Sequence, residues 1–150
     1  VEIVFDSQYL WTQATANREV AREIPMPPKR TSFPNLKATR ETFIAEWRRR
    51  IDSAGPVVVW GAGAKGVTFC TLVDTKAQKI AAVIDVNPAK QHKFIPLTGH
   101  PVLGPQALES LRPKTVIVMN PNYRDEIAAM LATMDVDADT LVLGETRVRN

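Results

Sequence analysis

The sequence of 150 residues has little of several features that mark particular classes of protein. Its one cysteine, Cys70, cannot form an internal disulfide, which favours a reducing compartment. No histidine lies near Cys70 in the sequence, so we predict a core residue rather than a nucleophile. The two histidines, His92 and His100, lack cysteine or carboxylate partners at metal-ligand spacing, so we predict no metal site.

Long apolar runs and a strong charge imbalance are also missing. No apolar stretch approaches the roughly 18 residues of a membrane span, and no signal peptide is visible, so we expect a cytoplasmic protein without membrane contact. The net charge of +3 comes from 19 basic and 16 acidic residues, which is too balanced to indicate a nucleic-acid partner. The apolar content of 45% is ordinary for a globular chain with one core.

Glycine is scarce, but three of the seven glycines stand close together. Val57–Trp60 reads as a strand buried on both faces, and a helix is predicted from Ala64. The spacing between them is G-x-G-x-x-G. In this motif Gly61 permits a tight turn, Gly63 lets the backbone approach a ligand, and Gly66 lets the helix pack on the strand. The simpler interpretation is a tight strand-to-helix turn without a ligand.

The rest of the chain alternates between helical and strand patterns. Helices are expected from a cap at Thr39 to about Ser53, from Ala64 to about Thr75, over Pro105–Leu111, and after an Asn120 cap with Pro121 at the first position. Strands are expected at Val57–Trp60, Ile80–Asp85, Thr115–Met119 and Thr140–Leu143, with Pro101–Leu103 as an optional fifth after a polar loop over Val86–Gly99. The alternation predicts a Rossmann-like three-layer αβα fold with an open, mostly parallel sheet of four to five strands.

The first residues have a different character. Val1–Phe5 and Tyr9–Thr15 indicate a hairpin, and the proline-rich stretch Ala16–Pro34 indicates a linker. We therefore predict two parts: residues 1–38, a hairpin and linker from a preceding domain, and residues 39–150, the αβα domain. Because the sequence begins at Val1 rather than Met, we expect a piece of a longer protein.

Two loops far apart in the chain are predicted to meet at one edge of the sheet. Right-handed crossovers place Ile80–Asp85 on one side of Val57–Trp60 and Thr115–Met119 on the other. Ligands of open α/β sheets bind where the strand order reverses, beyond the carboxyl ends of the strands. Gly61–Gly66 should therefore face Asn120–Tyr123 across one cleft, where two helix N-termini favour an anionic, sugar- or nucleotide-like ligand.

The candidate binding residues lie on these loops and after the second strand. They are Gly61, Ala62, Gly63, Lys65, Asp85, Lys90, Asn120, Asn122 and Tyr123; no catalytic residue is assigned. Lys65 is equally compatible with a solvated side chain. Lys90 is a candidate for contact with a phosphate, although a solvated loop is the favoured interpretation. Asn120 is also a good helix cap, and Tyr123 is also compatible with packing. Asp85 stands where a dinucleotide fold places its ribose-binding acid, or it caps its own loop.

Three segments together resemble the C-terminal domain of the sugar C-methyltransferases. They are Trp60–Gly66 (WGAGAKG), Asp85–Pro96 (DVNPAKQHKFIP), and Asn120–Tyr123 (NPNY) with Glu126-Ile127, and they span about Gly55 to Leu143. The resemblance implies an enzyme that methylates a carbon of a nucleotide-linked deoxysugar. It also implies an upstream methyltransferase domain that binds S-adenosylmethionine, and a nucleotide-sugar substrate held between the two domains.

The same resemblance also implies which functions this chain lacks when it is isolated. The catalytic base and S-adenosylmethionine would lie upstream, so no cofactor is expected here and the isolated chain should be inactive. Two alternatives stay open. One is an NAD(P)-binding oxidoreductase domain, which the glycine spacing and Asp85 support. The other is a non-catalytic interaction domain in which the glycines are structural.

Overall fold

The computed structural model describes residues 2–4, 9–11 and 35–144, and the chain divides into two units, Val1–Phe33 and Pro34–Asn150. In the first unit, strands β1 (Glu2–Val4) and β2 (Tyr9–Trp11) pair in antiparallel fashion. This pairing confirms the predicted hairpin. The predicted linker over 16–34 lies outside the described residues.

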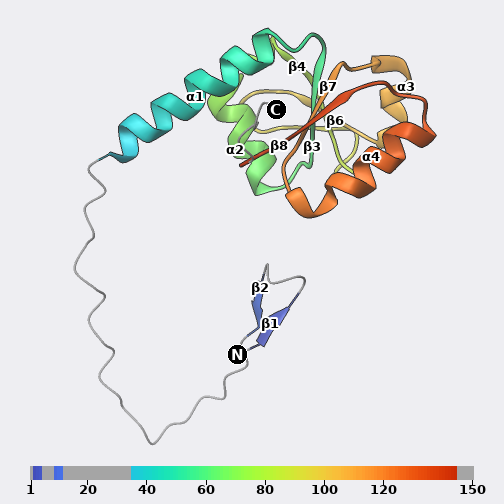
Figure 1. Cartoon of the computed structure of the whole chain (residues 1–150), viewed down its shortest axis with the longest axis horizontal. Helices are drawn as coiled ribbons and strands as arrows, with labels where there is room; N and C mark the ends of the chain where they lie inside the picture. The colour runs from blue at the N-terminus through green and yellow to red at the C-terminus, as the bar shows by residue number, and fades with distance from the viewer. Residues whose placement is uncertain (1, 5–8, 12–34, 145–150) are drawn as a thin grey trace, which may run out of the picture. The chain divides into compact units, whose positions relative to one another are not determined.

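The second unit contains a six-stranded sheet with the order β5-β6-β4-β3-β7-β8 (Figure 1). The strands are β3 (Val57–Trp60), β4 (Ile80–Ile84), β5 (Lys93–Phe94), β6 (Pro101–Leu103), β7 (Thr115–Val118) and β8 (Asp139–Val142). All neighbours are parallel except β5 and β6. The Rossmann-like αβα fold is thus confirmed. The expected count of four to five strands was too low, because β5 has only two residues, both exposed, and shows no apolar alternation.

Four α-helices accompany the sheet: α1 (Leu36–Asp52), α2 (Ala64–Val73), α3 (Leu108–Leu111) and α4 (Arg124–Thr133). Two 3₁₀ turns, η1 (Pro105–Ala107) and η2 (Pro121–Tyr123), precede α3 and α4. The expected cap of α1 at Thr39 is wrong, because the N-cap is Asn35 and the N–H of Thr39 donates to the Asn35 carbonyl. The apolar periodicity begins only at Phe43, so it does not indicate that the helix already includes the exposed first turn.

The sheet separates two apolar layers. Val57 and Val59 of β3 belong to the layer under α1 and α2, whereas Val58 and Trp60 belong to the layer under α3 and α4. All four side chains are at most 7% exposed, which confirms the predicted burial of β3 on both faces. Figure 1 shows α1 and α2 on one side of the strands and α3 and α4 on the other.

Helix α1 is fixed to α2 by aromatic contacts. The rings of Trp47 and Phe69 meet edge to face, with centroids 5.1 Å apart, and Phe43 completes the cluster. Arg48 donates from Nε to the carbonyl of Val73 at 3.0 Å, and so caps the C-terminal end of α2.

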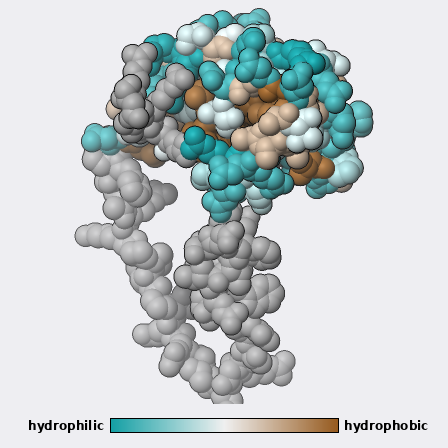
Figure 2. Space-filling view, turned by 45° about the vertical axis from the view of Figure 1, so that its right-hand side comes forward, coloured by the Kyte–Doolittle hydropathy of each residue, from teal (hydrophilic) through white to brown (hydrophobic). Residues whose placement is uncertain are grey.

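Figure 2 shows hydrophilic residues over most of the face in view. Among the described residues, no helix combines the length and apolar composition that crossing a bilayer requires.

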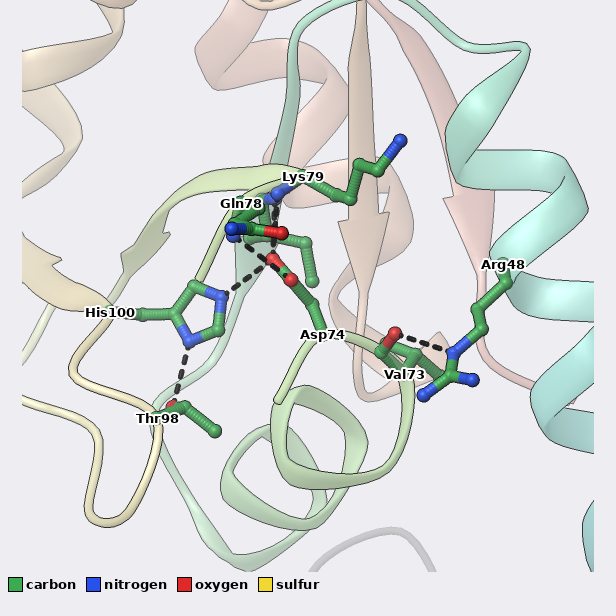
Figure 3. Close-up of polar contacts among 8 residues, drawn as sticks. Arg48, Val73, Asp74, Gln78, Lys79, Thr98 and His100 are labelled. Carbon is green, nitrogen blue, oxygen red and sulfur yellow. Dashed lines mark hydrogen bonds and ion pairs between the residues drawn. The ribbon is translucent and has the colours of Figure 1, made fainter. Parts of the chain in front are cut away.

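A buried carboxylate closes the turn between α2 and β4. Asp74, the C-cap of α2, accepts hydrogen bonds from three successive backbone N–H groups, at Gln78, Lys79 and Ile80. Oδ2, which accepts two of these N–H groups, also lies 3.0 Å from Nε2 of the fully buried His100, whose Nδ1 meets Thr98 Oγ1 at 2.8 Å (Figure 3). Burial opposes ionisation of Asp74, but the backbone donors and His100 outweigh it and hold its pKa below the ordinary value. This cluster ties the start of β4 to the start of β6.

Candidate functional site

The glycine-rich loop between β3 and α2 has the tight geometry that its spacing predicts. Gly61 has a φ of +115°, which a side chain would strain, and its N–H donates to the Ile84 carbonyl at 2.7 Å. A Cβ at Gly66 would lie 1.9 Å from the Gly61 carbonyl oxygen. Gly66 therefore lets α2 begin directly against the turn, and the predicted turn and packing roles of these two glycines are confirmed.

Gly63 differs from its two neighbours in the motif. It is the exposed N-cap of α2, and a Cβ built there would meet nothing within 4 Å. Packing inside the chain therefore does not require glycine at this position. Among the described residues, the N-cap position contributes no side-chain hydrogen bond to the first turn of α2, because Gly63 has no side chain. Close approach of a ligand at Gly63 stays a prediction.

Asp85 supports this loop from the end of β4. It is 6% exposed, and its Oδ2 accepts the N–H of Ala62 at 2.8 Å and the ammonium of Lys90 at 2.9 Å. Its Oδ1 accepts the N–H of Asn87 at 2.9 Å. Burial opposes ionisation, but these donors outweigh it and hold the pKa of Asp85 below its ordinary value. The structure thus shows Asp85 capping its own loop and bracing the glycine loop, while contact with a ribose stays a prediction.

The segment after Asp85 is folded back on β4. Gln91 donates from Nε2 to the Asp85 carbonyl at 2.9 Å, and the Ala89 N–H donates to Asn87 Oδ1 at 2.9 Å. The sequence analysis missed these contacts and treated the segment as a polar loop. The Asp-x-Asn spacing at 85–87 is a signal for side chains that accept backbone N–H groups two residues on, and it could have found the turn.

The second predicted loop follows β7. Asn120 caps η2, because its Oδ1 accepts the N–H of Asn122 at 3.2 Å, and Pro121 occupies the first position, as predicted. Tyr123 is 51% exposed, so its side chain is not part of the core. Lys65 on the other loop is also exposed. These exposed polar groups are available to a ligand, but whether they bind one stays a prediction.

The two loops lie next to each other at the carboxyl edge of the sheet. Strands β3 and β7 are parallel neighbours, and the N–H of Met119 donates to the Trp60 carbonyl at 3.1 Å. A Cβ at Gly61 would lie 3.4 Å from Met119 Cβ, so the two loops begin in contact. The chain passes from β3 to β4 and β6 on one side and returns to β7 on the other. The predicted reversal of strand order is confirmed, and Asp85 joins the same edge through Ala62.

Other candidate features near the site are weaker. A shallow hollow beside the first turn of α2 does not include the second loop; it is lined by Phe43, Ala64, Lys65, Thr68, Phe69, Leu72 and Leu143. Within the part of the chain that the structure describes, no three His, Cys, Asp or Glu side chains gather in a geometry that could hold a metal ion.

Cys70 should resist thiol reagents in the folded protein. It is fully buried in α2, and burial, together with the charge of Asp74, raises its pKa to about 12. At pH 8 only about one molecule in ten thousand would carry a thiolate. We expect no reaction with a chromogenic disulfide reagent in native buffer and one reacting thiol per chain in denaturant. Rapid native reaction would contradict the core role of this cysteine.

One comparison with known proteins identifies the family. A family model described as the C-methyltransferase C-terminal domain matches residues 13–143. No curated protein matches the chain significantly. Among solved structures, UDP-D-quinovosamine 4-dehydrogenase from Vibrio fischeri is similar, with 18% identity over 62% of this chain and 80% of that one, and a TM-score of 0.49. RSP, a Rex-family repressor, shares 13% identity over 73% of this chain and 56% of that one, with a TM-score of 0.46.

Proposed function

This chain belongs to the family of C-methyltransferase C-terminal domains, and we propose that it binds the nucleotide-linked deoxysugar on which an S-adenosylmethionine-dependent enzyme acts. The observation that carries the proposal is the meeting of two loops, after β3 and after β7, at the point where the strand order reverses. Ligands of open α/β sheets bind at such points. The family match over most of the chain supplies the reaction class.

Each loop contributes a different chemistry to this proposal. The first turn of α2, to which Gly63 contributes no capping side chain, offers backbone N–H groups and the positive end of a helix dipole, which suit a diphosphate. Lys65 adds a charge at the same turn. Asn122 and Tyr123 are exposed on the other loop and offer hydrogen bonds to the sugar or the base. In this proposal the chain binds and orients the substrate.

The methyl transfer itself is assigned to a preceding domain in this proposal. S-adenosylmethionine would supply the methyl group from that domain, and no residue described above is proposed to bind it. A base there would remove a proton from the carbon beside a ketone of the sugar, and that carbon would take the methyl group as S-adenosylhomocysteine departs. The isolated chain is therefore expected to bind substrate without turning it over.

Titration calorimetry tests the proposal. We expect heat when UDP-glucose, dTDP-glucose or GDP-mannose is added to this chain or to the full-length protein. Lys65→Met should weaken binding about tenfold, the scale of one charge-assisted hydrogen bond. Lys76→Met is the matched control, because Lys76 is also exposed but lies beyond the other end of α2. Absence of heat with all three compounds, even with the full-length protein, would contradict the proposal.

A second candidate is binding of NAD(P), which the geometry of the glycine loop favours. The contacts of Asp85 count against it, because Oδ2 already accepts from Ala62 and Lys90. Enhancement of NADH fluorescence on mixing, without heat from the sugar nucleotides, would favour this candidate over the first.

A further inference from the structure

The glycine-rich loop between β3 and α2 is hydrogen-bonded to a buried carboxylate. Asp85 Oδ2 accepts the N–H of Ala62, the residue between the first two glycines of the loop, at 2.8 Å. The carboxylate is shielded from water, with only 8% of its side chain exposed. A ligand with a diphosphate at the first turn of α2 would therefore approach a buried charge of its own sign. Unless that charge were cancelled, it would oppose the proposed ligand.

Lys90 supplies the opposite charge. Its Nζ lies 2.9 Å from Asp85 Oδ2, the same oxygen that accepts the Ala62 N–H. The lysine is held there by its own turn, in which the Lys90 N–H donates to the Asn87 carbonyl at 3.0 Å. The amide of Gln91 anchors the following residue to the Asp85 carbonyl. The ion pair is thus built into the fold of the segment rather than made by a side chain reaching from elsewhere.

From this geometry we infer that Lys90 is a positioning residue whose role is to cancel the charge of Asp85, so that Asp85 can brace the glycine loop without repelling an anionic ligand. The inference rests on the proposed function, because it concerns the affinity of the same site. It differs from the sequence-based expectation that Lys90 itself contacts a phosphate. In the structure Lys90 faces Asp85, and it acts on the ligand through that carboxylate.

A double-substitution cycle distinguishes a Lys90 that cancels the charge of Asp85 from a Lys90 that contacts the ligand directly. The variants are Lys90→Met, Asp85→Asn and the combination, each titrated with whichever of UDP-glucose, dTDP-glucose and GDP-mannose binds the unmodified protein most tightly. Lys90→Met should weaken binding about tenfold, because it exposes the ligand to an uncancelled buried charge. Asp85→Asn should bind as well as the unmodified protein or better, because its side-chain oxygen can still accept the Ala62 N–H, at the expense of the hydrogen bond from the Asn87 N–H.

The combined variant gives the decisive result. Removing both charges should restore affinity to within about twofold of the unmodified protein, because the energies of paired groups are not additive. If Lys90 contacted the ligand directly, the combined variant would stay as weak as Lys90→Met, and the inference would be overturned. An unchanged affinity in Lys90→Met would overturn it as well, while leaving the proposed function intact. Failure of the unmodified protein to bind any of the three compounds would instead overturn the proposed function.

Two controls keep the cycle interpretable. Lys79→Met removes the lysine of another ion pair, which joins Asp52 at 2.7 Å at the opposite end of β4, and it should leave affinity unchanged. Melting temperatures are recorded for every variant. If the pair of Lys90 and Asp85 were purely structural, Asp85→Asn would lower the melting temperature and weaken binding as Lys90→Met does. Full affinity in Asp85→Asn is therefore the result that a structural role would not produce.

Discussion

Replacing Gly66 with alanine is expected to destabilise the domain by more than about 3 kcal/mol, the upper range for inserting atoms into a packed interior. The new Cβ would lie 1.9 Å from the Gly61 carbonyl oxygen, which is a backbone atom and cannot rotate away. Relief requires α2 to move off β3 or the turn at Gly61 to open. Either change exposes part of the layer around Phe69. Urea unfolding followed by circular dichroism measures the loss.

Gly63→Ala is the matched control in the same loop. Its Cβ would meet nothing within 4 Å, and its φ of −91° suits any residue. We expect a loss of at most about 1 kcal/mol, because alanine is a poorer N-cap than glycine. If the proposed ligand approaches this backbone closely, Gly63→Ala should weaken sugar-nucleotide binding while leaving the fold intact. A Gly66→Ala protein as stable as the unmodified one would contradict the close approach of turn and helix.

Removal of the Asp74 side chain should lower the free energy of unfolding by about as much as Gly66→Ala. Asp74→Ala leaves three backbone N–H groups and the buried ring of His100 without their acceptor. Breaking a buried charged network in this way costs about 3–5 kcal/mol. Asp74→Asn should cost less, because the amide oxygen can still accept. Asp52→Asn, at a half-exposed ion pair, should change stability by less than about 1 kcal/mol. Equal effects of Asp74→Ala and Asp52→Asn would contradict this account.

Asp74 also gives the fold a dependence on pH. Its pKa is lower in the folded chain than the ordinary value of about 3.9 expected in the unfolded chain. The unfolded chain therefore takes up the proton first as the pH falls. The stabilisation is complete above the unfolded pKa and is lost as the pH falls through the folded pKa. Between about pH 5 and pH 3 the slope of unfolding free energy against pH should be shallower in Asp74→Asn; Asp85 contributes in the same direction.

The parts of the fold that could be predicted from sequence are those fixed by local patterns. β3 and β7 are runs of apolar, mostly β-branched residues, and such runs are typical of strands buried on both faces. The adjacency of their loops followed from the handedness of crossovers. β5 could not be found, because its two residues are exposed and are held only by backbone pairing with β6. The start of α1 was missed for a related reason, since its first turn buries nothing.

The candidate site was predictable in position but not in its internal contacts. Spacing alone put Asp85 after the second strand, but the hydrogen bond from Ala62 joins residues 23 apart and leaves no periodic signal. The same holds for Asp74 and His100, which are 26 residues apart. Neither histidine has a cysteine or carboxylate at short spacing, so the sequence could exclude a local metal motif but could not show the buried pair. Contacts of this kind depend on how the strands are ordered, which local patterns do not specify.

The order of the strands has a consequence for the newly made chain as it emerges from the ribosome. One neighbour of β3, β4, begins at Ile80, but its other neighbour, β7, begins only at Thr115. Synthesis runs from the N-terminus, so the ribosome makes the glycine turn before the opposing asparagine turn. Because domains generally fold as units, a chain released before Thr115 would lack β7 and one side of the proposed binding edge.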